Sequence, residues 1–202
     1  MASALLDNVS RETMERLRAL EALVQKWTKK INLVSGKDAL QVWDRHIVDS
    51  IQIFNLAPEG GSWLDIGSGG GFPGIVVAIL AKETDPDRTF SLVDSDQRKC
   101  AFLRTAAREL DLNVNVIAAR VEEIEPLNAQ VLSARALSDL PMLLEFAERH
   151  LSKSGMAVFP KGSSWQKEHE AAQKTWSYKL EVVRSMTNSD ATILKIEELK
   201  RV

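Results

Sequence analysis

The chain of 202 residues is poor in cysteine and histidine and has no long apolar run. Its one cysteine, Cys100, excludes an internal disulfide and suits a reducing cytoplasm, where we expect the protein to be located. Three histidines and one cysteine in no metal-ligand spacing argue against a zinc site, so we expect no bound metal. No run approaches the roughly 20 apolar residues that a membrane span needs, so we expect no membrane association.

The chain also lacks an excess of charge of either sign. It has 26 basic and 28 acidic side chains, for a net charge of -2, whereas a nonspecific RNA binder usually carries a basic excess. Any contact with RNA would therefore depend on a local patch. The most basic cluster consists of Lys26, Lys29, Lys30, Lys37 and Arg45. It fits either a contact with RNA phosphates or a solvated helix face.

Glycine is scarce, but half of it lies in one segment. Five of the ten glycines fall within residues 65–74, which read DIGSGGGFPG. Apolar residues on both sides predict a strand at 62–66, a tight turn, and a helix at 73–83. Glycine allows positive φ and lets a ligand come close to the main chain, so we expect a ligand to lie across this turn. A purely structural turn is the alternative.

Two cofactors compete for this glycine turn. Gly69, Gly71 and Gly74 satisfy the dinucleotide pattern G-x-G-x-x-G, but Pro73 removes an amide from the helix start that should face a pyrophosphate. An acid-x-Gly-x-Gly-x-Gly register fits better and is typical of an S-adenosylmethionine (SAM) loop. We therefore predict that the cofactor-binding residues of this turn are Asp65, Gly67, Gly69 and Gly71. Asp65 would orient the loop and meet the cationic amino acid moiety of SAM.

A second acid, Asp94, ends the next predicted strand, 89–93. A carboxylate at this point can accept hydrogen bonds from both hydroxyls of a ribose. The alternative is that Asp94 caps the helix that begins near Gln97, a task that Ser95 or Asp96 could also perform.

Helix and strand patterns alternate along most of the chain. Two helices are predicted between residues 10 and 56, with Ser10 and Thr13 at the start of the first; Trp27 and Trp43 lie on their apolar stripes, which favours core packing over base stacking. Further helices are predicted at 96–111, 121–124, 138–151 and 164–175, and further strands at 113–118, 130–134 and 155–160. Residues 178–186 and 191–197 predict a closing antiparallel hairpin.

This order predicts an α/β fold: the doubly wound, Rossmann-like sheet of a SAM-dependent methyltransferase, with a reversed C-terminal strand and an N-terminal helical extension. We expect a single domain over 1–202, with the extension at 1–58 and the SAM-binding α/β core at 59–202. Ligands of such sheets bind beyond the carboxyl ends of the strands. Outside the glycine turn and Asp94, the residues at such positions are 120–123, Arg135 and Lys161.

Several motifs occur together in a characteristic order. They are residues 32–35 (NLVS), 45–50 (RHIVDS), 65–74, 121–123 (VEE), 133–136 (SARA) and 161–162 (KG). In these motifs, which span about residues 25 to 162, the chain resembles the bacterial small-subunit ribosomal RNA guanine-N7 methyltransferases, formerly called glucose-inhibited division protein B.

The resemblance implies methyl transfer from SAM to N7 of a guanine in the 530 loop of 16S rRNA, the guanine-527 position. The substrate would be 16S rRNA or the small ribosomal subunit, and we expect the enzyme to be a monomer. By motif position, it implies that Gly67 and Phe72 contact SAM, Asp94 its ribose, and Val121 and Glu122 its adenine region. Ordinary helix-start carboxylates explain Glu122 equally well.

The chemistry of the remaining residues agrees with a ring-nitrogen target. An amino-directed methyltransferase would carry an Asp/Asn-Pro-Pro-aromatic motif where this chain has SARA at 133–136, and Cys100 comes too early for a cytosine-C5 nucleophile. N7 attacks without first losing a proton, so we predict no general base and catalysis by positioning and electrostatics.

Two cations are the candidates for positioning the substrate. Arg135 could donate to guanine O6, to a phosphate or to the cofactor, and Lys161 could contact a phosphate. A surface ion pair and a solvated lysine are the respective alternatives. His46 and Asp49 lie one helical turn apart and could share a hydrogen bond, either over the active-site mouth or as a packing anchor.

Three other functions stay open on the sequence alone. They are a SAM-dependent methyltransferase of another substrate, an NAD-binding oxidoreductase, and a SAM-binding ribosome-assembly factor without catalysis.

Overall fold

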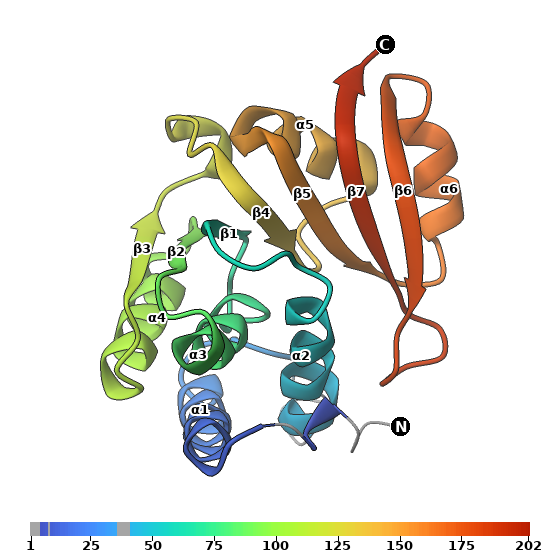
Figure 1. The fold of residues 1–202 in the computed structure, drawn as a ribbon. Coiled ribbons are helices and arrows are strands. Elements are labelled where there is room, and N and C mark those ends of the chain that lie inside the picture. Colours follow the sequence, from blue (N-terminus) through green and yellow to red (C-terminus); the bar gives the residue numbers. More distant parts are fainter. Residues whose placement is uncertain (1–4, 8, 36–40) are drawn as a thin grey trace.

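The computed structural model describes residues 5–7, 9–35 and 41–202. Within these residues, seven strands form one sheet in the order β3-β2-β1-β4-β5-β7-β6 (Figure 1). The strands are β1 (Ser62–Ile66), β2 (Thr89–Asp94), β3 (Val114–Ala118), β4 (Ala129–Ala134), β5 (Leu151–Lys161), β6 (Trp176–Arg184) and β7 (Thr192–Arg201).

The direction of each strand follows the predicted doubly wound pattern. β1 pairs in parallel with β2 and β4, and the parallel pairing continues outward to β3 and β5. β7 runs antiparallel to both β5 and β6, so the predicted reversed strand and closing hairpin are confirmed. The order reverses between β1 and β4, and at such a point the carboxyl ends of the strands leave room for ligands.

Helices cover both faces of the sheet. The helices are α1 (Arg11–Thr28), the π-helical turn η3 (Trp43–Val48), α2 (Asp49–Phe54), α3 (Gly74–Thr84), α4 (Gln97–Glu109), the 3-10 turn η4 (Val121–Glu123), α5 (Leu140–His150) and α6 (Trp165–Ala172). Figure 1 shows α1 to α4 together on one side and α5 with α6 on the other. The buried apolar residues form separate clusters. Leu20, Ile51 and Phe102 belong to one cluster, and Leu144 and Phe159 belong to another.

The N-terminal helices pack as their apolar stripes predict. Ser10 caps α1, because its hydroxyl accepts a hydrogen bond from the amide of Thr13 at 3.2 Å. Trp27 meets Phe102 edge-on with a centroid distance of 5.7 Å, and Trp43 lies under the guanidinium of Arg18. Both tryptophans are partly buried and pack against the apolar cluster that contains Leu20, as predicted. The division into an extension (1–58) and a core (59–202) stays a prediction.

One expectation about the second N-terminal helix is wrong. A regular α-helix was expected, but Trp43–Val48 forms a π-helical turn before α2 begins. Ile47 and Val48 at the end of this turn are buried, and an apolar pattern does not distinguish a π-helical turn from an α-helical one. Gly36, Lys37 and Leu40 lie outside the described residues.

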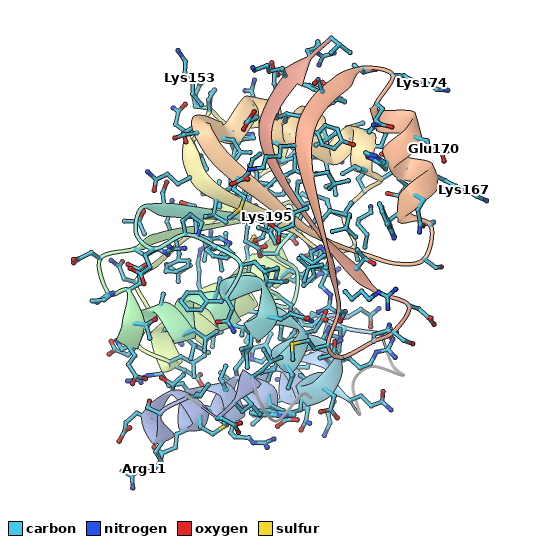
Figure 2. All side chains as sticks on the ribbon, turned by 45° about the vertical axis from the view of Figure 1, so that its right-hand side comes forward. Arg11, Lys153, Lys167, Glu170, Lys174 and Lys195 are labelled. Carbon is cyan, nitrogen blue, oxygen red and sulfur yellow. The ribbon has the colours of Figure 1, made fainter. Side chains whose placement is uncertain are left out.

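The outer side of α6 is charged and exposed. Figure 2 shows Lys167 and Glu170 of this helix, and Lys174 just after it, pointing away from the body of the molecule, while Ala172 at its end is fully buried. Among the helices of the described residues, none has the length and apolar character that crossing a membrane requires.

Candidate functional site

The glycine turn leaves β1 and enters α3 through three left-handed residues. Gly67, Gly69 and Gly71 have φ values of 64°, 51° and 83°, a region that L side chains rarely adopt. A Cβ on Gly67 would come within 2.7 Å of Leu137, and one on Gly71 within 2.7 Å of Ile75. The alternating glycines of the acid-x-Gly-x-Gly-x-Gly register therefore coincide with the positions where the backbone requires glycine.

Asp65 holds this turn from beneath. Its side chain is fully buried; one carboxylate oxygen accepts from the hydroxyl of Ser133 at 2.6 Å and the other from the amide of Gly74 at 3.3 Å. Burial raises the pKa of Asp65 to about 6, and the hydrogen bonds from Ser133, Ser68 and Gly74 only partly oppose that rise. Asp65 thus fixes the helix start relative to β4.

Asp94 links the glycine turn to the end of β2. One oxygen of its carboxylate accepts from the amide of Gly69 at 2.8 Å, and the other from the amide of Asp96 at 2.8 Å. The cap of α4 is Asp96, whose carboxylate accepts from the amide of Arg98, so the capping alternative for Asp94 is wrong. Beneath this site Cys100 is buried, and burial raises the pKa of its thiol, as for a cysteine that serves in packing.

A cavity of about 600 Å³ opens beside these groups at the carboxyl ends of the strands. Four of the predicted cofactor-binding residues line it: Gly67, Asp94, Val121 and Glu122. Its volume lies within the range of small-molecule sites, roughly 300 to 1,000 Å³.

The apolar wall of this cavity was missed by sequence reasoning. Leu137, Met142 and Phe146 line it, on the β4–α5 loop and on α5. Leu137 and Met142 are exposed although they are large and apolar. Met142 and Phe146 fall inside the predicted helix 138–151, where nothing in the sequence marks them as cavity residues. The position of Leu137 in the loop just after the fourth strand was a signal that could have found it.

The turn at Val121 is fixed from below by a buried histidine. The Nε2 atom of His150 lies 2.9 Å from the carbonyl oxygen of Val121, so we assign the neutral tautomer that donates from Nε2. Burial lowers the pKa of His150, which agrees with a neutral ring. Because Val121 and Glu122 line the cavity, this histidine holds part of the cavity wall in place.

Other predicted cofactor residues shape the turn and do not line the cavity. Phe72 is buried and stacks on His46, with ring centroids 4.9 Å apart. Asp65, Gly69 and Gly71 are likewise not among the residues that line the cavity. In this arrangement they act on the shape of the glycine turn, and a direct contact of these residues with a cofactor stays a prediction.

A second cavity, of about 300 Å³, adjoins the first and shares Ala136 with it. Arg135 and Lys161, the two predicted positioning residues, both line this second cavity. Arg45 and Asp49 from the N-terminal helices and Thr187 and Asn188 from the β6–β7 turn line it too. The structure therefore brings together four segments that are far apart in the sequence.

The two predicted positioning residues are both held by protein groups. Arg135 Nη2 donates to the carbonyl oxygen of Arg45 at 2.6 Å and lies 3.4 Å from Asp49 Oδ2. Lys161 Nζ donates to the carbonyl oxygen of Ser138 at 2.9 Å and lies 2.5 Å from Glu168 Oε2. The side chain of Lys161 is only 10% exposed, so the solvated-lysine alternative is wrong. Burial would raise the pKa of Glu168, but its bonds from Lys161 and neighbouring donors outweigh this and lower it.

Comparison with known proteins identifies the family. The family model described as GidB, rRNA small subunit methyltransferase G, matches residues 13–196. The chain belongs to the GidB family. The ribosomal RNA small subunit methyltransferase G of Ruegeria sp. (strain TM1040) is 55% identical over 195 residues, covering 96% of this chain and 95% of the relative. The protein of the same name from Gluconobacter oxydans (strain 621H) is 44% identical, covering 98% and 100%. The resemblance stated from the motifs is thereby confirmed.

Solved structures agree with the fold of this GidB-family chain. A SAM-dependent methyltransferase from Aquifex aeolicus superposes with a TM-score of 0.62 at 16% identity, covering 85% of this chain and 97% of the other. M. jannaschii TYW2 in complex with AdoMet gives a TM-score of 0.58 at 13% identity, covering 87% and 80%. At such identities the likeness concerns the fold, and it confirms the predicted SAM-dependent methyltransferase sheet.

The larger cavity of the GidB-family chain fits SAM by its donor set. A carboxylate, Asp94, stands where ribose hydroxyls need acceptors, and each of its oxygens has a further lone pair beyond the amide that it already binds. Gly67 leaves the cavity floor without a side chain, and Leu137 and Phe146 offer apolar surface for a purine ring. These groups match a ligand that carries a sugar and a purine base.

Proposed function

We propose that this chain transfers a methyl group from SAM to N7 of a guanine in the 530 loop of 16S rRNA. The observation that carries the proposal is the pair of adjoining cavities at the carboxyl ends of the strands, joined at Ala136, in a chain of the GidB family. The first is suited to a nucleoside cofactor, and the second gathers charged groups for a nucleobase with its phosphates. The relatives' printed name, ribosomal RNA small subunit methyltransferase G, supports the substrate class.

The cofactor would be held in the larger cavity by the glycine turn and the acids around it. Asp94 would accept the ribose hydroxyls, and the Val121 turn, with Glu122, would meet the adenine. Asp65 would orient the turn through the amide of Gly74, since its carboxylate is fully buried. When bound, SAM supplies a methyl group on a positively charged sulfur.

The target base would be held in the smaller cavity. Arg135 has a planar fork of donors that suits guanine O6 or a phosphate oxygen, and Lys161 contributes a second positive charge. Because N7 has its lone pair in the ring plane, the reaction requires no group that removes a proton. The chain's task is to keep the base in line with the methyl group.

The carboxylates of the smaller cavity suit the charge of the product. N7 methylation leaves a positive charge on the guanine, and Asp44, Asp49 and Glu168 all line this cavity. Negative groups fixed before the reaction stabilise a charge that develops during it. This favours a ring-nitrogen target over a nucleophile that ends neutral after losing a proton.

The partner would be 16S rRNA or the small ribosomal subunit, which also assigns the chain to the cytoplasm. Since the major groove of an RNA helix is deep and narrow, the target N7 would be reached in a loop or an opened helix. Arg45 lines the smaller cavity and Lys26, Lys29 and Lys30 are exposed at the end of α1, so they are candidates for phosphate contacts. We propose that the chain acts as a monomer.

Methylation of unmodified small subunits and of naked 16S rRNA with radiolabelled SAM tests this function. The label should be incorporated once per rRNA, at a guanine whose glycosidic bond becomes sensitive to borohydride and aniline, as N7-methylguanine is. Label at another atom would contradict the proposed target. SAM binding without any transfer would indicate an assembly factor, and calorimetric binding of NAD without binding of SAM would indicate an oxidoreductase.

A further inference from the structure

The carboxylate of Asp49 joins three segments that are distant in the sequence. Its Oδ1 accepts from Gln52 Nε2 at 2.7 Å, from Thr187 Oγ1 at 2.8 Å and from Ser185 Oγ at 3.3 Å. Its Oδ2 lies 3.4 Å from Arg135 Nη2. Asp49 begins α2, Arg135 follows β4, and Ser185 and Thr187 belong to the β6–β7 turn. One side chain, only 13% exposed, thus ties the turn and α2 to the end of β4.

The β6–β7 turn is docked on α2 through its main chain as well. The amide of Met186 donates to Gln52 Oε1 at 3.0 Å, and Gln52 Nε2 also donates to Ser185 Oγ at 3.2 Å. Ser185 Oγ in turn accepts from the amides of Thr187 and Asn188. The turn that lines the smaller cavity therefore has a defined position relative to Asp49.

Arg135 is held at two points on the same side. Its Nη2 atom donates to the carbonyl oxygen of Arg45 and faces the carboxylate of Asp49. A guanidinium is planar, so two fixed contacts set the orientation of its remaining donors. The side chain keeps 21% of its surface exposed in the cavity that it lines.

The negative charge of Asp49 matters more for Arg135 than for the β6–β7 turn. The hydroxyls of Ser185 and Thr187 and the side-chain amide of Gln52 are neutral donors, and an asparagine oxygen at position 49 could still accept from them, although more weakly than the carboxylate does. An asparagine would, however, turn an NH2 group toward the guanidinium in place of a charged oxygen. The substitution would therefore weaken the attraction that holds the guanidinium on the Asp49 side of the cavity, where Nη2 and Oδ2 lie 3.4 Å apart.

We infer that Asp49 is a positioning residue for methyl transfer: docked on the β6–β7 turn, it holds the guanidinium of Arg135 toward the target base in the smaller cavity. This inference rests on the proposed function.

A double-mutant cycle of Asp49→Asn and Arg135→Ala tests the inference. Single-turnover transfer to unmodified small subunits and the Kd for SAM are measured for the wild type, both single variants and the double variant. We expect Asp49→Asn to slow transfer about tenfold to a hundredfold with an unchanged Kd for SAM, because a small misplacement of a positioning group has effects of this size. In the Arg135→Ala background, Asp49→Asn should have no further effect.

Asp85→Asn is the matched control. The side chain of Asp85 is also 13% exposed and also pairs with an arginine, Arg88, at 2.7 Å, but it lies at the other end of the strands, after α3. The Asp85→Asn substitution should lower the midpoint of unfolding and leave the rate of methyl transfer as in the wild type. If Asp49→Asn does not fold, Thr187→Val removes one of the bonds that hold Asp49 and should give a smaller loss that also disappears with Arg135→Ala.

Independent effects of the two substitutions, so that the losses multiply, would overturn the inference. So would full activity of Asp49→Asn, or an equal loss in Asp85→Asn. A failure of the proposed function is distinguished from these by the wild-type arm, in which no N7-methylguanine would form, and the inference would then fall with it.

Discussion

Asp65 should make this protein less stable as the pH rises from about 4 to 7, the reverse of the usual effect of an aspartate. Burial raises its pKa from 3.8 to about 6, so the folded protein holds this proton more tightly than the unfolded chain does. Between these two values the native state binds more protons, and the free energy of unfolding falls with increasing pH. A difference of about 2 units at about 1.4 kcal/mol each amounts to about 3 kcal/mol in total.

Asp65→Asn removes this dependence because the amide is uncharged at every pH. The carboxylate of Asp65 accepts hydrogen bonds from both Gly74 and Ser133, whereas the side-chain amide of an asparagine has only one oxygen and can accept from one of them. If its oxygen accepts from the amide of Gly74, its NH2 meets Ser133 Oγ, which already accepts from Trp63 Nε1, and the serine proton loses its acceptor. One lost hydrogen bond costs about 1 kcal/mol at all pH values. The pH dependence, and not the absolute stability, therefore carries the test.

Urea unfolding of the wild type and Asp65→Asn in parallel at pH 5, 6 and 7 measures the difference. All other titrating groups are present in both proteins, so their contributions to the pH dependence cancel in the difference. The stability of the wild type relative to the variant should fall by about 1 kcal/mol between pH 5 and pH 7, the part of the total that lies in this window. A difference that stays constant, or that rises with pH, would refute the assignment of a raised pKa to the buried carboxylate.

Three further substitutions test individual contacts of the site. Asp94→Ala should raise the Kd for SAM at least tenfold by calorimetry, because it removes about 1.5 to 3 kcal/mol of charged hydrogen bonding and also leaves the amide of Gly69 without its acceptor. An unchanged Kd would contradict the assignment of Asp94 to the ribose. His150→Phe should lower the free energy of unfolding by about 1 to 3 kcal/mol and weaken SAM binding, since it leaves the carbonyl oxygen of Val121 without its donor. Full SAM affinity in this variant would show that the Val121 turn does not depend on His150. Gly74→Ala should lower the free energy of unfolding by about 1 to 3 kcal/mol, because the new Cβ would come within 2.3 Å of Leu92 and 2.7 Å of Asp65, whereas Gly162→Ala, which meets nothing within 4 Å, should leave it unchanged.

The larger cavity was accessible to sequence reasoning because its polar groups obey a local rule. In an open α/β sheet the residues just after the strands share one edge, whatever the tertiary details. The strand-forming runs before Gly67, Asp94 and Val121 are evident in the sequence, and all three residues line the cavity. The chemistry of the cofactor could be inferred from residue type and position alone.

The apolar wall and the smaller cavity could not be predicted in the same way. Phe146 looks like any core residue of an amphipathic helix, and only the packing of α5 shows which face is left open. The partners of Arg135 come from the N-terminal helices, and those helices meet the β6–β7 turn across a sequence separation of 138 residues, from Asp49 to Thr187. No local pattern encodes a contact of that kind. The π-helical turn that precedes Asp49 is likewise invisible to a 3.6-residue period.

The segment after β4 shows how the two cavities are joined. Ala136 lines both, and its φ of 53° is left-handed, which costs about 1 to 2 kcal/mol for a residue other than glycine. Arg135 before it lines the smaller cavity, while Leu137 after it lies against Gly67 in the larger one. A glycine at 136 would adopt this conformation with less strain but would also allow many others. Alanine at this position restricts the backbone more than glycine would, and Lys161 donates a hydrogen bond to the carbonyl oxygen of Ser138 two residues later. Both features limit the conformations of the loop between the two cavities. Under the proposed function, the methyl donor and the guanine meet across this loop. Its rigidity would then supply the alignment that N7 transfer requires, in a site that has no proton to remove.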